Sequence, residues 1–124
     1  MSRSCGNGAH ADHDVYDALC PCRDVLDLIA NKWATLAIGA LEARPLRFGE
    51  LQRQLAGVSP KVLSSTLKRL EANGFVSRTV VPEVPLRVEY ELTPLGHSLN
   101  VPLRGIREWA ELHLDELPAG RPSA

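Results

Sequence analysis

The sequence has no apolar run near the roughly 20 residues that a membrane-spanning helix needs, and its first residues lack the apolar stretch of a secretory signal. It also lacks a glycine-rich phosphate loop, a nucleophile elbow and a paired-histidine motif. We therefore expect a cytoplasmic protein that does not contact a membrane, is not an enzyme and carries no cofactor.

Cysteines are few, and the three that are present cannot all pair within one chain; they are Cys5, Cys20 and Cys22. A reducing cytosol keeps such thiols free. Any disulfide in this chain would therefore have a regulatory role and would not serve to stabilise the fold.

Length and composition predict one compact domain. Hydrophobic residues make up 44% and charged residues 23% of the 124 residues, which is close to the globular average. Residues 1–14 and 118–124 are rich in glycine, proline and polar residues without periodicity, so we predict flexible tails there. The folded domain is expected over residues 15–117.

The formal net charge of −1 is distributed unevenly along the chain. Residues 1–30 carry a net charge of −3, whereas residues 44–92 carry +3. An acidic flank beside a basic centre fits a protein that contacts an anion with one face only.

The first half of the domain is predicted to be helical. Apolar residues recur at three- and four-residue steps over 23–43, with a break near Asn31 and an end before Pro45. A second, short helix is predicted over 48–55, and Gly57 then permits the left-handed conformation that ends a helix.

The clearest helix start is Ser59-Pro60, because serine can accept a hydrogen bond from an unpaired backbone N–H and proline loses nothing at the first helical position. This helix is predicted to run to Gly74. Its leucines share one side, and the opposite side is polar and cationic. That second side carries Lys61, Ser64, Ser65 and Lys68, with Arg69 on its rim.

Two alternating runs follow, 76–81 and 86–92, separated by a proline-containing turn over 82–85, and they predict a two-stranded hairpin. Thr93-Pro94 repeats the cap-and-proline signal and opens a last helix. The order helix, helix, short turn, helix, hairpin, helix predicts a winged helix-turn-helix, a mainly α fold with a two-stranded β-hairpin wing (α+β).

In such a module the helix after the turn lies in the DNA major groove, where its outward side chains reach base edges and phosphates. Any single lysine or arginine on a surface is ordinarily just solvated. A cationic helix face next to a basic hairpin, however, favours the interpretation that this surface binds DNA. Arg44 and Arg53 are interpreted as ordinary surface residues. The predicted DNA-binding residues are Arg47, Ser59, Lys61, Ser64, Ser65, Lys68, Arg69, Arg78 and Arg87.

Together these motifs resemble those of the HxlR-type (MarR-like) regulators of bacteria. The resemblance extends from residue 20 to about 112 and is carried by Cys20-Pro21, Leu26-Asp27-Leu28-Ile29, Lys32-Trp33, Arg47-Phe48-Gly49-Glu50-Leu51, Val58-Ser59-Pro60-Lys61-Val62-Leu63, Pro82-Glu83-Val84-Pro85, Arg87-Val88-Glu89-Tyr90 and Leu92-Thr93-Pro94-Leu95-Gly96. It implies a dimeric winged-helix transcription factor, often one that controls a neighbouring detoxification or metabolic gene. Ala30-Asn31 stands where the family usually has Gly-Gly.

The resemblance also concerns Cys20, because many relatives have a cysteine there that in some of them senses oxidants, quinones or aldehydes. A position just before a helix favours the thiolate, whereas Asp17 and Asp24 oppose it, so a sensor and a small apolar filler are both open. Cys22 follows across Pro21, and we expect strain to disfavour a Cys20–Cys22 disulfide. A bond between subunits or a mixed disulfide with a small thiol is the expected product. Cys20 and Cys22 are the redox-sensing candidates.

A metal site is the competing interpretation of the N-terminal region. Its candidate zinc ligands are Cys5, His10, His13, Cys20 and Cys22. Their spacing matches no compact zinc pattern. We therefore expect thiol chemistry here and no metal.

The apolar stripe of the last helix exceeds what one small domain needs, although packing onto the domain's own core can absorb part of it. The predicted dimer interface comprises Leu95, Leu99, Leu103, Ile106, Trp109 and Leu117, together with the N-terminal segment. The hypothesis is a homodimer that binds a pseudo-palindromic double-stranded operator, mostly to repress, with an electrophile or oxidant as a further partner. The alternatives are a regulator that responds to a metal or small ligand, and a winged helix that binds protein and not DNA.

Overall fold

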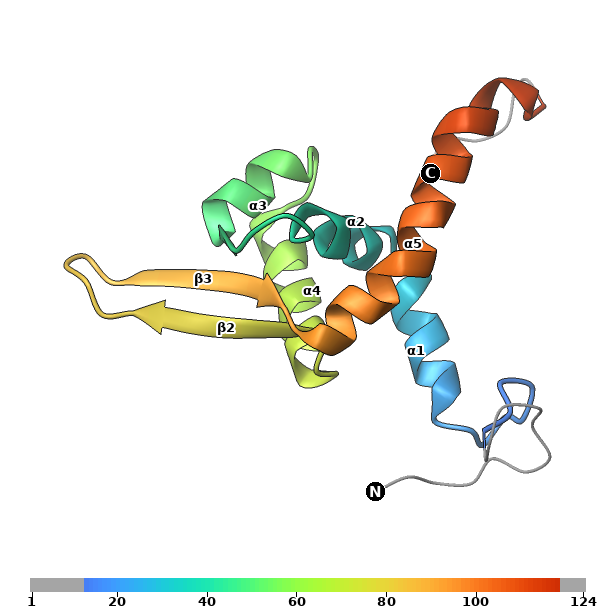
Figure 1. Cartoon of the computed structure of the whole chain (residues 1–124), viewed down its shortest axis with the longest axis horizontal. Helices are drawn as coiled ribbons and strands as arrows, with labels where there is room; N and C mark the ends of the chain where they lie inside the picture. Colours follow the sequence, from blue (N-terminus) through green and yellow to red (C-terminus); the bar gives the residue numbers. More distant parts are fainter. Residues whose placement is uncertain (1–12, 119–124) are drawn as a thin grey trace.

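The computed structural model describes residues 13–118, in which helices predominate and a small antiparallel sheet extends to one side (Figure 1). The mainly α fold with a hairpin wing is thereby confirmed. The predicted tails, and with them Cys5 and His10, lie almost entirely outside the described residues. The elements are α1 (Cys22–Ile29), α2 (Lys32–Ala40), β1 (Leu46–Arg47), α3 (Phe48–Gln54), α4 (Pro60–Ala72), β2 (Val76–Val81), β3 (Arg87–Leu92), α5 (Pro94–His113) and the short 3-10 helix η1 (Leu114–Glu116).

Asn31 divides the first predicted helix in two, as expected. Its side chain accepts hydrogen bonds from the backbone N–H groups of Trp33 at 2.8 Å and Ala34 at 3.4 Å, which caps α2. The Thr35 hydroxyl donates to the Ile29 carbonyl at 3.0 Å, so the end of α1 is held against the start of α2. The two helices thus meet at a fixed corner.

The helix-turn-helix is formed by α3, a short connection and α4. Gly57 in the connection has a φ of +93°, the left-handed region that glycine tolerates. Ser59 caps α4 by accepting a hydrogen bond from the Val62 N–H at 3.1 Å, and Pro60 occupies the first turn. The predicted start of this helix is confirmed. Buried side chains on its inner side, Leu63, Thr66, Leu67 and Leu70, anchor it in the core.

The wing contains a third strand that the sequence did not predict. β1 pairs with β3, with Leu46 opposite Tyr90 and Arg47 opposite Glu89, so the strand order is β1-β3-β2. Two residues are too few to show an alternating pattern. Because β1 leads directly into α3, this pairing ties the wing to the helix-turn-helix.

The start of α5 packs against the end of α4. The Thr93 hydroxyl donates to the Gly74 carbonyl at 2.6 Å, and the Thr93 N–H donates to the Phe75 carbonyl at 3.1 Å. Gly96 lies so close to this carbonyl that a Cβ added there would be 2.1 Å from the Phe75 oxygen. These contacts form the α4–α5 joint, which consists of Gly74, Phe75, Thr93 and Gly96.

A polar cluster fastens the middle of α5 to α2. The Arg107 guanidinium donates to the Thr35 carbonyl at 3.2 Å and to the amide oxygen of the buried Asn100 at 2.8 Å. Asn100 in turn donates to the carboxylate of Glu42, and this hydrogen bond, with the nearby Arg104, holds the pKa of Glu42 below its usual value. Beyond this cluster the second half of α5 projects away from the body (Figure 1). Within residues 13–118 no helix is both long and apolar enough to cross a membrane.

Candidate nucleic-acid interface

The outward side of α4 carries exposed cations. Lys61, Ser65 and Lys68 are exposed and lie opposite the buried leucines of the same helix. Within residues 13–118, neither lysine takes part in an ion pair. Both ammonium groups therefore remain available to an anion.

A hollow lies between α4 and the wing and brings together three of the predicted residues. Ser64 and Lys68 line it from α4, and Arg78 lines it from β2. Arg78 faces this way because it stands opposite Tyr90 and shares a sheet face with the buried Val76 at the base of the strand. The other lining residues are Leu67, Glu71 and Tyr90.

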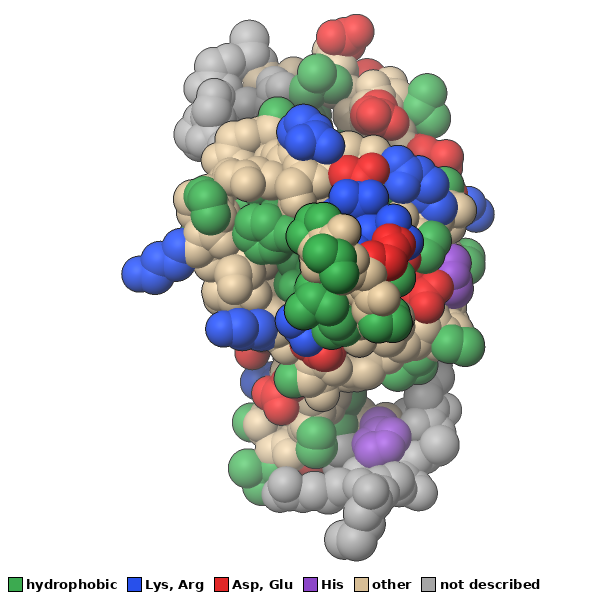
Figure 2. All heavy atoms as spheres, turned by 90° about the vertical axis from the view of Figure 1, so that its left-hand side faces the viewer, with side chains coloured by type: hydrophobic (Ala, Val, Ile, Leu, Met, Phe, Trp, Pro, Cys, Tyr) green, Lys and Arg blue, Asp and Glu red, His purple; other side chains and the backbone are tan. Residues whose placement is uncertain are grey.

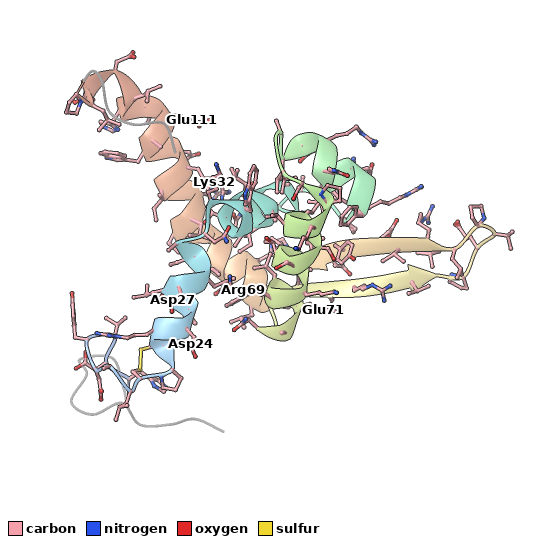
Figure 3. All side chains as sticks on the ribbon, turned by 180° about the vertical axis from the view of Figure 1, so that it is seen from behind. Asp24, Asp27, Lys32, Arg69, Glu71 and Glu111 are labelled. Atoms are coloured by element: carbon pink, nitrogen blue, oxygen red, sulfur yellow. A yellow bond between two sulfur atoms is a disulfide. The ribbon has the colours of Figure 1, made fainter. Side chains whose placement is uncertain are left out.

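Arg69 lies outside this hollow. Figure 3 places its side chain and that of Glu71 on opposite flanks of α4, as two residues 200° apart around a helix must be. Arg69 is exposed, but it points away from the wing. Its role in DNA binding remains a prediction, separate from the group around Lys68.

The second cation predicted for the wing, Arg87, is not free. Its guanidinium forms ion pairs with Glu83 at 3.3 Å and with Glu89 at 3.2 Å, and the side chain is half-buried. Arg87 and Glu89 are two residues apart on one strand, so they share the sheet face that Arg78 does not occupy. Two carboxylates thus offset the charge that the sequence assigned to DNA.

Arg47 stands between the helix-turn-helix and the wing tip. Its side chain is exposed and lines a shallow hollow with residues 83–87 of the turn. Its backbone N–H donates to Glu50 at 2.9 Å, and this bond, helped by Arg44 at 3.3 Å, lowers the pKa of the Glu50 carboxyl. Glu50 therefore caps α3 as an anion and is paired with Arg44.

The wing tip is apolar, a property that was not predicted from the sequence. Val80, Val84 and Leu86 are all exposed there. Figure 2, which looks onto the tip, shows hydrophobic side chains gathered at its centre with both basic and acidic side chains around them. The signal was present in the turn itself, where Pro82 to Leu86 contains one charged residue.

Cys20 and Cys22 are joined by a disulfide, so the expectation that strain would keep them apart is wrong (Figure 3). Pro21 adopts a helical conformation, with φ −59° and ψ −18°, and this turn brings the two Cα atoms to 5.3 Å. That separation is within the usual range of disulfides. Pro21 begins the turn into α1, and this turn is what brings the two cysteines together.

The six residues predicted for a dimer interface divide into two groups. Leu103 is buried in the core of its own chain and Leu99 packs against that core. Leu95, Ile106, Trp109 and Leu117 are exposed. Further exposed apolar residues, not predicted individually, are Val101, Leu112 and Leu114 on α5 and η1 and Tyr16, Leu19 and Leu26 at and before α1.

No group of three or more metal-ligating side chains comes together within residues 13–118. His13 lies near the cysteine pair, with its Nδ1 4.0 Å from the Cys20 Sγ. The competing zinc interpretation also needs Cys5 and His10, which are outside the described residues.

The chain is similar in sequence to known helix-turn-helix regulators. It is 41% identical over 108 residues to the HTH-type transcriptional regulator YtfH of Escherichia coli, a match that covers 87% of this chain and 86% of YtfH. The structure of YtfH from Salmonella typhimurium superposes with a TM-score of 0.78 at 38% identity, over 84% of this chain and 93% of that one.

Two further solved structures have the same winged-helix fold. The reduced form of the transcriptional regulator YodB from Bacillus subtilis has a TM-score of 0.68 at 33% identity, covering 81% of this chain and 99% of YodB. The redox regulator HypR in its oxidized form has a TM-score of 0.69 at 35% identity, covering 74% and 95%. All three proteins are named as regulators and none as an enzyme. Since the pattern of the family also matches residues 28–118, the chain belongs to the HxlR-like helix-turn-helix family of transcriptional regulators.

Proposed function

We propose that this chain is a homodimeric repressor that binds a pseudo-palindromic double-stranded DNA operator through α4 and the wing. The observation that carries the proposal is the meeting of Ser64 and Lys68 of α4 with Arg78 of the wing along one hollow. Such a regulator acts in the cytoplasm.

The size and charge of α4 suit the major groove, which admits one helix and displays hydrogen-bonding groups of all four bases. Lys61 and Lys68 can donate to guanine or phosphate, and Ser64 and Ser65 can donate or accept. The acidic side chains of α1, Asp24 and Asp27, lie well away from α4 (Figure 3). The chain can therefore approach a polyanion with this face without bringing its acidic region close.

The exposed apolar residues of α5 support the homodimer. Ile106 is 59% exposed and Trp109 is 53% exposed, on a helix whose second half projects from the body (Figure 1). A second copy of the same helix would cover these side chains, as two-fold dimers do with self-complementary patches. The dimer would hold two recognition helices for two half-sites about one helical turn apart.

Oxidants or electrophiles are the proposed signal, acting through Cys20. The support is the cysteine pair at the start of α1 together with the similarity to YodB, solved in a reduced and a diamide-treated form, and to the redox regulator HypR. Repression relieved or imposed by oxidation would then depend on these thiols.

The DNA-binding proposal is tested by the salt dependence of affinity. A duplex selected from a random pool by the wild-type protein is titrated at increasing potassium chloride concentration, with fluorescence anisotropy as the readout. Several cation–phosphate contacts predict an affinity that falls steeply with salt. Lys68→Ala should flatten the slope by about one ion, whereas Arg44→Ala, the matched control whose charge is paired with Glu50, should leave it nearly unchanged.

Two results would contradict the proposal. If no duplex is enriched, or if binding to DNA is independent of salt, a winged helix that binds protein becomes the better interpretation. If the two variants lower the slope equally, the hollow beside α4 is not the contact surface.

The dimer is tested by sedimentation at micromolar concentration. We expect a dimer for the wild type and a monomer for Ile106→Asp, because a carboxylate would be buried without a partner. Leu86→Asp is the control, since Leu86 is also exposed but lies on the wing. A monomeric wild type would refute the homodimer.

A further inference from the structure

We infer that the redox-active unit of this chain is the Cys20–Cys22 pair itself, which an oxidant such as a hydroperoxide closes within one chain, without a thiol from a second subunit. The bond ties the segment before α1 to the start of that helix. Its effect on DNA binding rests on the proposed function, whereas the formation of the bond does not.

Burial favours a bond within the chain. Cys20 is 3% exposed, so a thiol of another subunit has little access to its sulfur. Cys22 is half-buried and only 5.3 Å away between Cα atoms. A group held on the same turn also meets its partner at a high effective concentration. The neighbouring cysteine is therefore the favoured partner for Cys20.

The more accessible Cys22 is the entry point for the oxidant. It is the first residue of α1 and is partly exposed, whereas Cys20 is 3% exposed. The Cys22 thiol gives up its proton and its sulfur attacks the terminal peroxide oxygen. The O–O bond breaks, a sulfenic acid forms on Cys22, and the leaving alkoxide takes up the proton from the thiol and departs as an alcohol. The Cys20 thiol then attacks the Cys22 sulfur, the S–S bond forms, and hydroxide leaves and takes up the proton as water. Two thiols and one hydroperoxide thus give one disulfide, one alcohol and one water, and the peroxide accepts two electrons.

The contacts around the pair identify what the bond holds. Arg23 donates from Nε to the Val15 carbonyl at 2.9 Å and from a terminal nitrogen to the Tyr16 carbonyl at 3.2 Å. The Cys22 N–H approaches the Cys20 sulfur at 3.4 Å. The disulfide and Arg23 are therefore two ties that fold the preceding segment back onto α1.

This segment carries part of the exposed apolar surface. Tyr16 is 87% exposed and Leu19 is 78% exposed, and Tyr16 shares a hollow with Leu26 of α1. Oxidation fixes the segment before α1 before the subunits associate. A preorganised surface loses less conformational entropy on binding. Reduction removes the covalent tie and leaves the hydrogen bonds from Arg23 to Val15 and Tyr16. The oxidised chain should consequently form the tighter dimer.

The bond is tested on the full chain carrying Cys5→Ser, which removes the third thiol. After treatment with cumene hydroperoxide we expect the intact mass to fall by two hydrogen atoms and the protein to migrate as a single protomer on a non-reducing gel. Cys22→Ser in the same background should not lose these hydrogens. A covalent dimer in the Cys5→Ser protein, or two thiols still titratable after treatment, would overturn the inference.

The consequence is tested by sedimentation of the same protein, reduced and oxidised. Oxidation should tighten the dimer by at least about fivefold, the lower end of ordinary coupling between sites, and the Cys22→Ser variant should not respond. An unchanged dimer affinity despite the loss of two hydrogens would overturn the regulatory role. Failure of both forms to bind any DNA would refute the proposed function instead, because mass and sedimentation do not depend on DNA.

Discussion

Two glycines of α5 should respond in opposite directions to the same substitution. A Cβ at Gly96 would be 2.1 Å from the Phe75 carbonyl oxygen and 3.1 Å from a methyl group of Leu92. A Cβ at Gly105 would meet nothing within 4 Å. Gly96→Ala and Gly105→Ala therefore form a matched pair within one helix.

The magnitudes follow from these contacts. In an exposed helix interior alanine is more favourable than glycine by about 1 kcal/mol, so Gly105→Ala should stabilise the fold by about 0.5–1 kcal/mol. At Gly96 this gain is outweighed, because the first turn of α5 must move away from Phe75. Overpacking costs about 1–3 kcal/mol, and the two Thr93 hydrogen bonds of the α4–α5 joint contribute about 1 kcal/mol each. We expect Gly96→Ala to lower the free energy of unfolding by about 2 kcal/mol.

Urea unfolding followed by circular dichroism measures both variants against the wild type. Each is measured at two protomer concentrations, because association adds a concentration-dependent part to the stability. Equal stabilisation by the two alanines would refute the close packing of α5 against the end of α4. Equal destabilisation would instead indicate that Gly105 is covered in the assembled protein.

Two further substitutions test charges in the structure. Arg87→Ala should flatten the salt dependence of DNA binding by much less than one phosphate contact, because Glu83 and Glu89 already offset the charge of Arg87. A reduction of the salt slope as large as that caused by Lys68→Ala would contradict this expectation. The pKa of Glu42 is lowered mainly by its hydrogen bond from Asn100. The ionised carboxylate therefore stabilises the fold at pH values above the ordinary glutamate pKa of about 4.3. This stabilisation is lost as the pH falls through the lower pKa of the folded state. Urea unfolding from neutral to acid pH measures the difference in stability between wild type and Glu42→Gln. This difference should shrink at low pH. A constant difference would show that ionisation of the Glu42 carboxylate does not contribute to the stability of the fold.

Helix starts were predictable because they depend on local chemistry. The serine and threonine caps followed by proline, at Ser59 and Thr93, each fix a backbone conformation without help from the rest of the chain. The break at Asn31 has the same origin. β1 was missed because Leu46 and Arg47 become a strand only when β3 lies beside them.

The candidate site was harder to predict because its residues act through distant neighbours. Alternation along β3 places Arg87 and Glu89 on one face, yet it does not show that they pair or that Glu83 reaches back to join them. Helical periodicity groups Leu103 with Ile106 although only the first meets the core. The Cys20–Cys22 prediction was wrong because the helical turn at the intervening proline depends on where α1 begins.

The α4–α5 joint has a consequence for the spacing of an operator. In the proposed dimer the two recognition helices are connected through two such joints, one in each subunit, and hydrogen bonds from Thr93 fix the position of each. One extra base pair between half-sites shifts the second half-site by about 3.4 Å and rotates it by about 35°. Because these joints are closely packed, the two recognition helices cannot rotate relative to each other by that amount. An operator lengthened by one base pair would therefore bind one subunit at a time. Spacer length is thereby selected by the packing of α5, at a distance from every side chain that contacts a base.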